Sequence, residues 1–339
     1  MRHLSTTTRH LTGRHMDFEE EIKDRLGYRL FRKVVGSRAG GCINEGEAFE
    51  VDGDRKVFVK KCVTENACQV VTGEFAGLQA IAATATTRVP QPIDVVFAPD
   101  ASSAVIVMEY LTLDRLKSPE KLGEQLADLH SHNEKMRLRR LADASRVGKY
   151  DNNTEESHVT SFGFDTTTCC GSVAMNNEWV DDWESFFARN RLEEQMSLIQ
   201  ENYGDRQCLE LWSQLQIVIP DFFNEFHQKD SQIRPALLHG DLWSGNAAES
   251  EEGPVIFDPS AFYGHSEYDL AIGKIFGGFS GAFYSSYCGR SSGLTAAAER
   301  RIQLYQLFHY LNHWNHFGSG YREQSLALMK RLLIDVKLK

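Results

Sequence analysis

Three polar residues in the second half of the chain have the types and spacing of a phosphoryl-transfer site. Asp241 follows a histidine and a glycine, Asn246 lies five positions later, and Asp258 comes directly after the apolar run 255–257. In phosphoryl transfer one aspartate accepts the proton of the attacking hydroxyl, while an amide oxygen and a second carboxylate hold Mg²⁺ on the triphosphate. The ordered set predicts Asp241 as the base and Asn246 and Asp258 as magnesium ligands.

A glycine cluster and a lysine-bearing strand near the start would cover the phosphates of ATP. The cluster spans residues 36–46 and contains Gly40 and Gly41, and residues 48–60 have the alternation of a β-hairpin that ends at Lys60. Glycines let the backbone approach phosphates closely, and the lysine supplies a positive charge. The loop fits neither G-x-G-x-x-G nor the Walker pattern, so taken alone it is equally compatible with a flexible turn.

Two further elements complete the predicted nucleotide site. Residues 66–83 have helical periodicity and include Glu74, which in the kinase arrangement pairs with the strand lysine. Residues 104–108 form a buried-strand pattern that leads into a hinge, whose backbone would contact the adenine edge through Met108, Glu109 and Tyr110.

The second half of the chain is predicted to be mainly helical. We expect an amphipathic helix over 121–133, a long surface loop over 137–161 and helices from 183 to 226. His130 is expected to be structural, and Asp269, which opens a helix, is expected to brace the catalytic loop. No activation segment of the protein-kinase kind follows Asp258, which favours a small-molecule acceptor over a peptide.

Composition sets limits on the class of protein. The 339 residues carry a net charge of -10, which argues against a nucleic-acid partner. No apolar run approaches the roughly 18 residues of a membrane span. Seven cysteines show no metal-ligand spacing, and their low density indicates a cytoplasmic protein.

Three regions are expected along the chain. Residues 1–16 are predicted to be a disordered leader, although the acid-free stretch 1–15 also has features of a mitochondrial transit peptide. Residues 17–110 would form the nucleotide-binding lobe, and residues 111–339 the catalytic and acceptor-binding lobe.

From residue 17 to the C-terminus the chain resembles the fructosamine-3-kinase (ketosamine-3-kinase) family, and most closely its ketosamine-3-kinase branch. The resemblance rests on eight segments: residues 40–46, 58–60, 122–130, 162–171, 177–183, 238–246, 262–267 and 310–317. It implies an α+β, bilobal protein-kinase-like fold of the aminoglycoside phosphotransferase and choline kinase type. It also implies ATP- and Mg²⁺-dependent phosphorylation of the sugar 3-hydroxyl of ketosamines, free or protein-bound, which leads to deglycation.

The resemblance also suggests roles for individual residues. Trp243, two positions after the base, would stack on the acceptor sugar. His313 and Trp314 would line the acceptor pocket, although the aromatic and histidine-rich segment 304–317 is also compatible with core packing. Cys42, in the glycine loop, matches a cysteine associated with redox control through a disulfide-linked dimer, although a small residue that fills a tight turn is an equal alternative. The protein is therefore expected to be a monomer or a redox-dependent homodimer.

Two other functions stay open at this stage. One is a kinase for a different small hydroxyl acceptor, such as an amino alcohol or an aminoglycoside. The other is a nucleotide-binding pseudokinase that senses redox state through Cys42. The acceptor sugar, whether ribulosamine, psicosamine or fructosamine, is not determined by the sequence.

Overall fold

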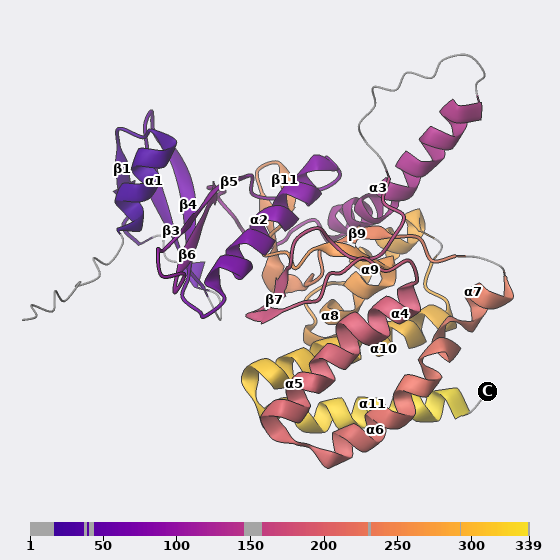
Figure 1. Ribbon diagram of the computed structural model, residues 1–339. Coiled ribbons are helices and arrows are strands. Elements are labelled where there is room, and N and C mark those ends of the chain that lie inside the picture. Colours follow the sequence, from indigo (N-terminus) through magenta and orange to yellow (C-terminus); the bar gives the residue numbers. More distant parts are fainter. Residues whose placement is uncertain are drawn as a thin grey trace, which may run out of the picture.

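A sheet-rich N-terminal lobe and a helical C-terminal lobe make up the molecule (Figure 1). The computed structural model describes residues 17–36, 39–40, 44–145, 158–229, 232–291 and 293–337, with backbone alone at 39–40, 44, 144–145 and 337. Within these ranges, no helix is long and apolar enough to cross a membrane.

The N-terminal lobe is built on an antiparallel sheet in the order β1-β3-β4-β6-β5, with β2 paired to β3. Its strands are β1 (Phe31–Lys33), β2 (Ala39–Gly40), β3 (Asn44–Val51), β4 (Arg55–Cys62), β5 (Pro92–Phe97) and β6 (Ala104–Glu109). The predicted hairpin is confirmed as β3–β4, which turns through Gly53 and Asp54 at positive φ. Alternating valines on β4, β5 and β6 pack under α1 (Phe18–Leu26) on one face of the sheet.

The opposite face of the sheet is covered by α2 (Ala67–Ala83), which also joins the two lobes. Its glycines allow backbone segments of the C-terminal lobe to come close. A Cβ at Gly73 would lie 2.6 Å from the carbonyl oxygen of Thr167, and one at Gly77 would lie 3.2 Å from the ring of Pro259. The helix therefore fixes the position of the N-terminal sheet relative to the segment that follows Asp258.

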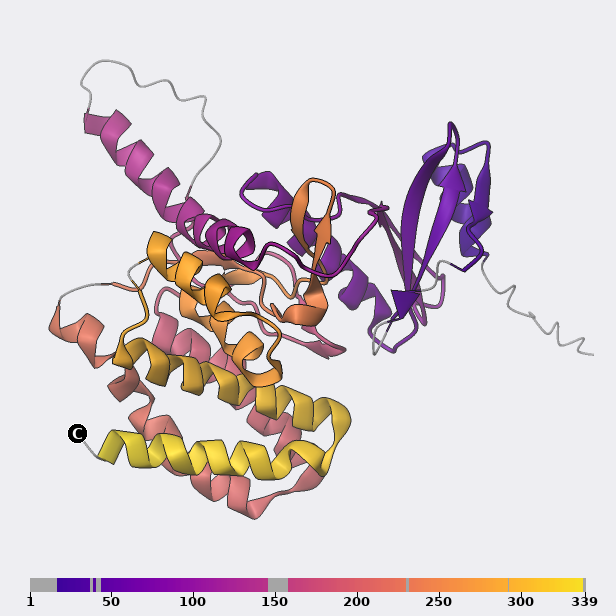
Figure 2. The same cartoon turned by 180° about the vertical axis from the view of Figure 1, so that it is seen from behind.

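The C-terminal lobe consists of helices around short two-stranded ribbons (Figure 2). The ribbons are β7 (Cys169–Cys170) with β8 (Val173–Ala174), β9 (Ala236–Leu238) with β12 (Phe262–Gly264), and β10 (Ala247–Ser250) with β11 (Gly253–Ile256). The helices are α3 (Pro119–Ser145), α4 (Trp183–Phe187), α5 (Glu194–Tyr203), α6 (Arg206–Val218), α7 (Asn224–Gln228), α8 (Asp269–Phe276), α9 (Gly281–Arg290), α10 (Ala296–Phe317) and α11 (Arg322–Lys337).

One prediction from the sequence is partly wrong. The helix expected over 121–133 runs on to Ser145, so the first part of the predicted loop 137–161 is helical. The polar and charged composition of this part suggested a loop. Its residues are nevertheless mostly strong helix formers, and Arg137 forms an ion pair with Glu134 one turn earlier. An exposed helix needs no apolar face where such pairs support it.

Candidate active site

The catalytic loop leaves β9 and reaches Asp241 through a turn that requires glycine. Gly240 has φ +85°, and a Cβ there would lie 2.1 Å from the carbonyl oxygen of Ser260. The backbone N–H of Ser260 in turn donates to the carbonyl oxygen of His239 at 2.8 Å. This close approach explains why glycine occupies the position where protein kinases usually have arginine.

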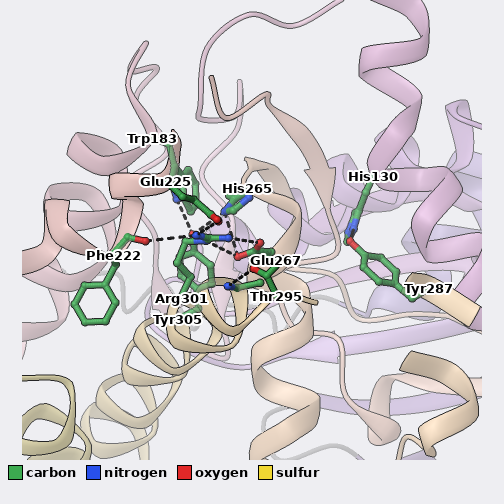
Figure 3. A network of polar contacts seen from close by, with 11 residues as sticks. His130, Trp183, Phe222, Glu225, His265, Glu267, Tyr287, Thr295, Arg301 and Tyr305 are labelled. Atoms are coloured by element: carbon green, nitrogen blue, oxygen red, sulfur yellow. Dashed lines mark hydrogen bonds and ion pairs between the residues drawn. The ribbon is translucent and has the colours of Figure 1, made fainter. Parts of the chain in front are cut away.

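Asp269 holds this turn in place through hydrogen bonds to its backbone. Its carboxylate accepts the backbone N–H groups of His239 and Gly240, both at 2.7 Å, and faces His130 Nε2 at 3.0 Å. The other ring nitrogen of His130 bonds to the hydroxyl of Tyr287 (Figure 3). Burial alone would raise the pKa of Asp269, but these hydrogen bonds and the nearby imidazoles lower it. Asp269 is therefore held as a charged brace, the structural role expected from the sequence.

Asp241 lies half-buried at the end of the braced turn. The Nδ2 group of Asn246 donates to its backbone oxygen at 2.9 Å and to Oδ2 at 3.2 Å. Burial, reinforced by the negative charge of Asp258, raises the pKa of Asp241 to about 7. A carboxyl group with a pKa near neutrality is well suited to accept a proton from an acceptor hydroxyl.

Lys60 connects the two lobes electrostatically. Its Nζ bonds to both carboxylate oxygens of Glu74, at 2.9 and 2.8 Å, and to Asp258 Oδ1 at 2.9 Å. The ion pair with Glu74 that the sequence predicts is thus present. Burial would lower the pKa of Lys60, but the carboxylates of Asp258 and Glu74 raise it above its usual value, so the amine is charged. Asp258 has φ +57°, a strained backbone conformation for a residue other than glycine.

The oxygen atoms around Asp241 fit a magnesium ion. Asn246 directs its Nδ2 group to the aspartate, which leaves its amide oxygen for a cation, and the side chain of Asp258 is 41% exposed beside it. Mg²⁺ prefers oxygen ligands of this kind and commonly uses one or two protein groups together with phosphates. Asn246 and Asp258 would therefore hold the ion, which would neutralise charge on the transferred phosphoryl group.

Aromatic side chains line one side of the catalytic loop. The indole of Trp243 lies against Gly245, and its ring centroid is 6.0 Å from that of Phe276. Phe276 in turn contacts the ring of His313 on α10 at 4.7 Å, so Trp243 and His313 belong to one wall. Phe276 was not predicted from the sequence, because α8 brings it to this wall from a different part of the chain.

Trp314 does not belong to this wall, which corrects the expectation that it lines the acceptor pocket. It is only 1% exposed, and its ring packs at 5.7 Å from that of Tyr203 on α5. Adjacent residues on a helix point about 100° apart, so His313 and its neighbour serve different surfaces.

The remaining predicted residues belong to the predicted nucleotide site. Met108 and Glu109 are the last residues of β6. The backbone N–H of Glu109 donates to the carbonyl oxygen of Gln91 at 2.8 Å, so it is not available to an adenine ring. Tyr110 follows directly, with Lys56 Nζ 5.3 Å from the centre of its ring. Gly40 pairs with Glu45 in β2–β3. Gly41 and Cys42 lie outside the described residues.

Comparison with known proteins assigns this arrangement to a family. The family model described as fructosamine kinase matches residues 16–335. The chain belongs to the fructosamine kinase family. Ketosamine-3-kinase of Mus musculus is 51% identical over 301 residues, which cover 88% of this chain and 95% of the mouse protein.

Solved structures show the same fold as this chain. A fructosamine-3-kinase homologue from Haemophilus somnus superposes with a TM-score of 0.70 at 20% identity, over 93% of this chain and 96% of the other. An aminoglycoside phosphotransferase superposes with a TM-score of 0.53 at 13% identity, over 94% and 97%. The predicted bilobal fold of the aminoglycoside phosphotransferase type is therefore confirmed.

Proposed function

We propose that this protein is an ATP-dependent ketosamine-3-kinase, which phosphorylates the sugar 3-hydroxyl of ribulosamines, psicosamines or fructosamines on glycated amines. The observation that carries the proposal is the convergence of Asp241, Asn246 and Asp258 beside the Lys60–Glu74 ion pair. This occurs in a chain that is 51% identical to a ketosamine-3-kinase. A pseudokinase usually lacks at least one of these side chains.

In this proposal the nucleotide lies between the lobes. Gly40 and Gly41 cover its phosphates, Lys60 contacts the α- and β-phosphates, and Glu74 keeps that lysine in place. The hinge residues Met108 to Tyr110 contact the adenine edge through backbone groups. Since the N–H of Glu109 is used by Gln91, the N–H of Tyr110 is the donor that we assign to adenine.

The acceptor enters against Trp243, Phe276 and His313. A sugar presents C–H groups to an aromatic face and hydroxyls to polar tips, which suits an indole beside an imidazole. His313 Nδ1 faces the backbone oxygen of His309 at 2.8 Å, so the ring is fixed with Nε2 turned to the other side. Asp241 then accepts the proton of the 3-hydroxyl as the phosphoryl group arrives. The 3-phosphate makes the adduct unstable, and the free amine is recovered.

For regulation and location we retain the hypotheses made from the sequence. Oxidation would link Cys42 residues of two chains into a homodimer of low activity, and reductant would restore the monomer. A protein of this cysteine content would act in the cytoplasm. Nonreducing electrophoresis of wild type and Cys42→Ala tests the dimer, because an oxidant-induced dimer that persists in the variant excludes this link.

An acceptor panel tests the proposed function. Purified protein with reductant, Mg²⁺ and ATP is given ribulosamine, psicosamine or fructosamine derivatives of one amine, with the unmodified amine and an aminoglycoside as controls. We expect ADP formation and a sugar 3-phosphate with at least one ketosamine only. Turnover of the aminoglycoside alone, or of no acceptor at all, would overturn the proposal.

A further inference from the structure

Three chemically different side chains meet at the proposed catalytic base, Asp241 itself being one of them. Cys170 comes from β7, Asp241 from the catalytic loop and His309 from the middle of α10. One sulfur, one carboxylate oxygen and one ring nitrogen lie within 4.8 Å of one another. Cys170 and His309 are buried, and Asp241 is half-buried.

His309 differs from the other buried histidines of the described chain. His130, His239 and His265 each bond to a neighbour through a ring nitrogen. Both ring nitrogens of His309 are buried without a hydrogen-bond partner. A buried polar group without a hydrogen-bond partner destabilises the fold, so its presence calls for an explanation. Burial also lowers the pKa of His309 to about 3, so its ring is neutral and has a lone pair available.

The sulfur of Cys170 is positioned rather than merely buried. Asn312 Nδ2 donates to the sulfur at 3.2 Å and to the backbone oxygen of the same cysteine at 3.3 Å. Asn312 lies on α10, one turn after His309, so a single helix fixes two of the three groups. The set is therefore built into the fold and not a chance contact of surface residues.

We propose that Cys170, Asp241 and His309 bind a thiophilic divalent cation such as Zn²⁺, and that this cation inhibits the enzyme by capturing Asp241. Sulfur and imidazole ligands select Zn²⁺, Cd²⁺ or Co²⁺ over Mg²⁺, whereas Asn246 and Asp258 offer oxygen only. Zinc bond lengths of about 2.0–2.3 Å in a tetrahedron place ligand atoms roughly 3.2–3.8 Å apart. Closing the site therefore needs shifts of about 1 Å.

Charge balance favours this site for a dication. Burial raises the pKa of Cys170 well above the usual value for a thiol, so the empty site holds the protonated form. Binding displaces the thiol proton, and the resulting thiolate and the Asp241 carboxylate neutralise the two charges of the metal. The occupied site is then neutral, whereas the empty site with an ionised Asp241 carries one negative charge. The inhibitory part of the proposal rests on the proposed function, in which Asp241 is the base, whereas metal binding itself does not.

Cobalt binding tests the site without any assay of activity. Co²⁺ is added to full-length protein kept reduced with a phosphine, and the thiolate-to-cobalt charge-transfer band is recorded for wild type, Cys170→Ser and Cys169→Ser. The two variants make the same change at adjacent buried positions, and Cys169 lies outside the cluster. We expect the band in wild type and Cys169→Ser and its loss in Cys170→Ser. A band that is absent from wild type, or retained in Cys170→Ser, overturns the site.

Zinc inhibition provides the second measurement. With excess Mg²⁺–ATP, the Zn²⁺ concentration for half inhibition should rise about tenfold or more in Cys170→Ser, each variant being compared with its own metal-free rate. His309→Gln should have the same effect, which keeps the test open should Cys170→Ser fold poorly. Equal sensitivity of both variants and wild type overturns the inhibition. If the protein phosphorylates no ketosamine but still shows a Cys170-dependent cobalt band, the proposed function is wrong and the metal site is supported.

Discussion

Two groups of charged side chains in this kinase differ in one respect. In one group the neighbouring residues stabilise the charged forms, and in the other they oppose the charge of a carboxylate. The Arg301 cluster (Arg301, Glu225, Glu267) lies in the C-terminal lobe (Figure 3). Arg301 donates to both carboxylate oxygens of Glu267 at 2.8 Å and stacks on Phe226 at 4.8 Å. Although burial opposes both charges, pairing with Glu267 raises the pKa of Arg301, and His265 together with Arg301 lowers the pKa of Glu267.

The cleft cluster (Lys60, Glu74, Asp241, Asp258) shows the opposite behaviour at Asp241. One ammonium group faces three carboxylates, and the pKa of Asp241 is raised to about 7 by burial and by Asp258. The surplus negative charge lies where the metal ion would bind. Burial of charge is therefore not itself a sign of function. The sign is a partly exposed carboxylate whose neighbours oppose its charge.

Replacing Lys60 should lower activity and stability at once, because this residue belongs to structure and site together. Lys60→Met is expected to lower kcat/KM by about 10²–10³-fold, the loss typical of a removed charge-stabilising donor. It should also lower the free energy of unfolding by about 3–5 kcal/mol, since Glu74 is left buried without its partner. Steady-state kinetics and urea unfolding measure the two effects.

Lys61→Met is the matched control for that experiment. Lys61 is the next residue on β4 and is exposed, with its amine 5.4 Å from the ring centre of Phe18. Its loss should change kcat/KM less than about twofold and stability by roughly 0.5 kcal/mol. Equal losses of kcat/KM and of stability in Lys60→Met and Lys61→Met would mean that only the positive charge of the strand matters, and not the position of the Lys60 amine.

Replacing Arg301 should affect stability alone. Arg301→Met leaves two carboxylates without their partner, so we expect a loss of about 3–5 kcal/mol in the free energy of unfolding. Chemical denaturation measures this loss, and kcat at a temperature where the variant stays folded should match wild type. A lower kcat with unchanged stability would contradict the separation of the two clusters.

The pH dependence of activity and of stability tests the raised pKa of Asp241. Because its pKa is about 7, kcat/KM should fall about tenfold for each pH unit below 7, provided that the carboxylate form is the base. The free energy of unfolding should depend on pH in the opposite direction. A carboxyl whose folded pKa is raised contributes stability at low pH and loses it as pH rises through about 7. Thermal unfolding should therefore show that Asp241→Asn raises Tm more at pH 8 than at pH 5, and an equal Tm difference at both would contradict the raised pKa.

The smallest expected effect concerns the acceptor wall. Trp243→Ala should raise the KM for the ketosamine by about tenfold, the effect of losing roughly 1–1.5 kcal/mol of aromatic contact, and leave the KM for ATP unchanged. Trp314→Phe is the control, because that ring lies in the core. Equal changes in both Michaelis constants would place Trp243 outside the acceptor site.

The sequence predicted the parts of the site that are close together along the chain. Asp241 and Asn246 share one loop, and the β3–β4 hairpin that carries Lys60 follows from local alternation. Residues joined only by tertiary folding gave no such signal: Cys170 and His309 meet behind Asp241 from β7 and α10.

Helix α10 shows the second reason for incomplete prediction. Its buried residues cover more than half of its circumference, so periodicity could not tell that His313 contacts Phe276 while Trp314 packs in the core. The C-terminal end of α3 was not predicted to be helical, because it is exposed and buries no apolar stripe.

The role of Asp241 as the base for ketosamine phosphorylation is tested by Asp241→Asn. The measurement is ketosamine-dependent ADP formation at saturating Mg²⁺–ATP, with nucleotide affinity determined on the same preparation. The substitution keeps the shape of the side chain and removes its ability to accept a proton. We predict a fall in kcat of about 10²–10⁴-fold with nucleotide affinity nearly unchanged. A variant that turns over ketosamine at the wild-type rate would contradict the account.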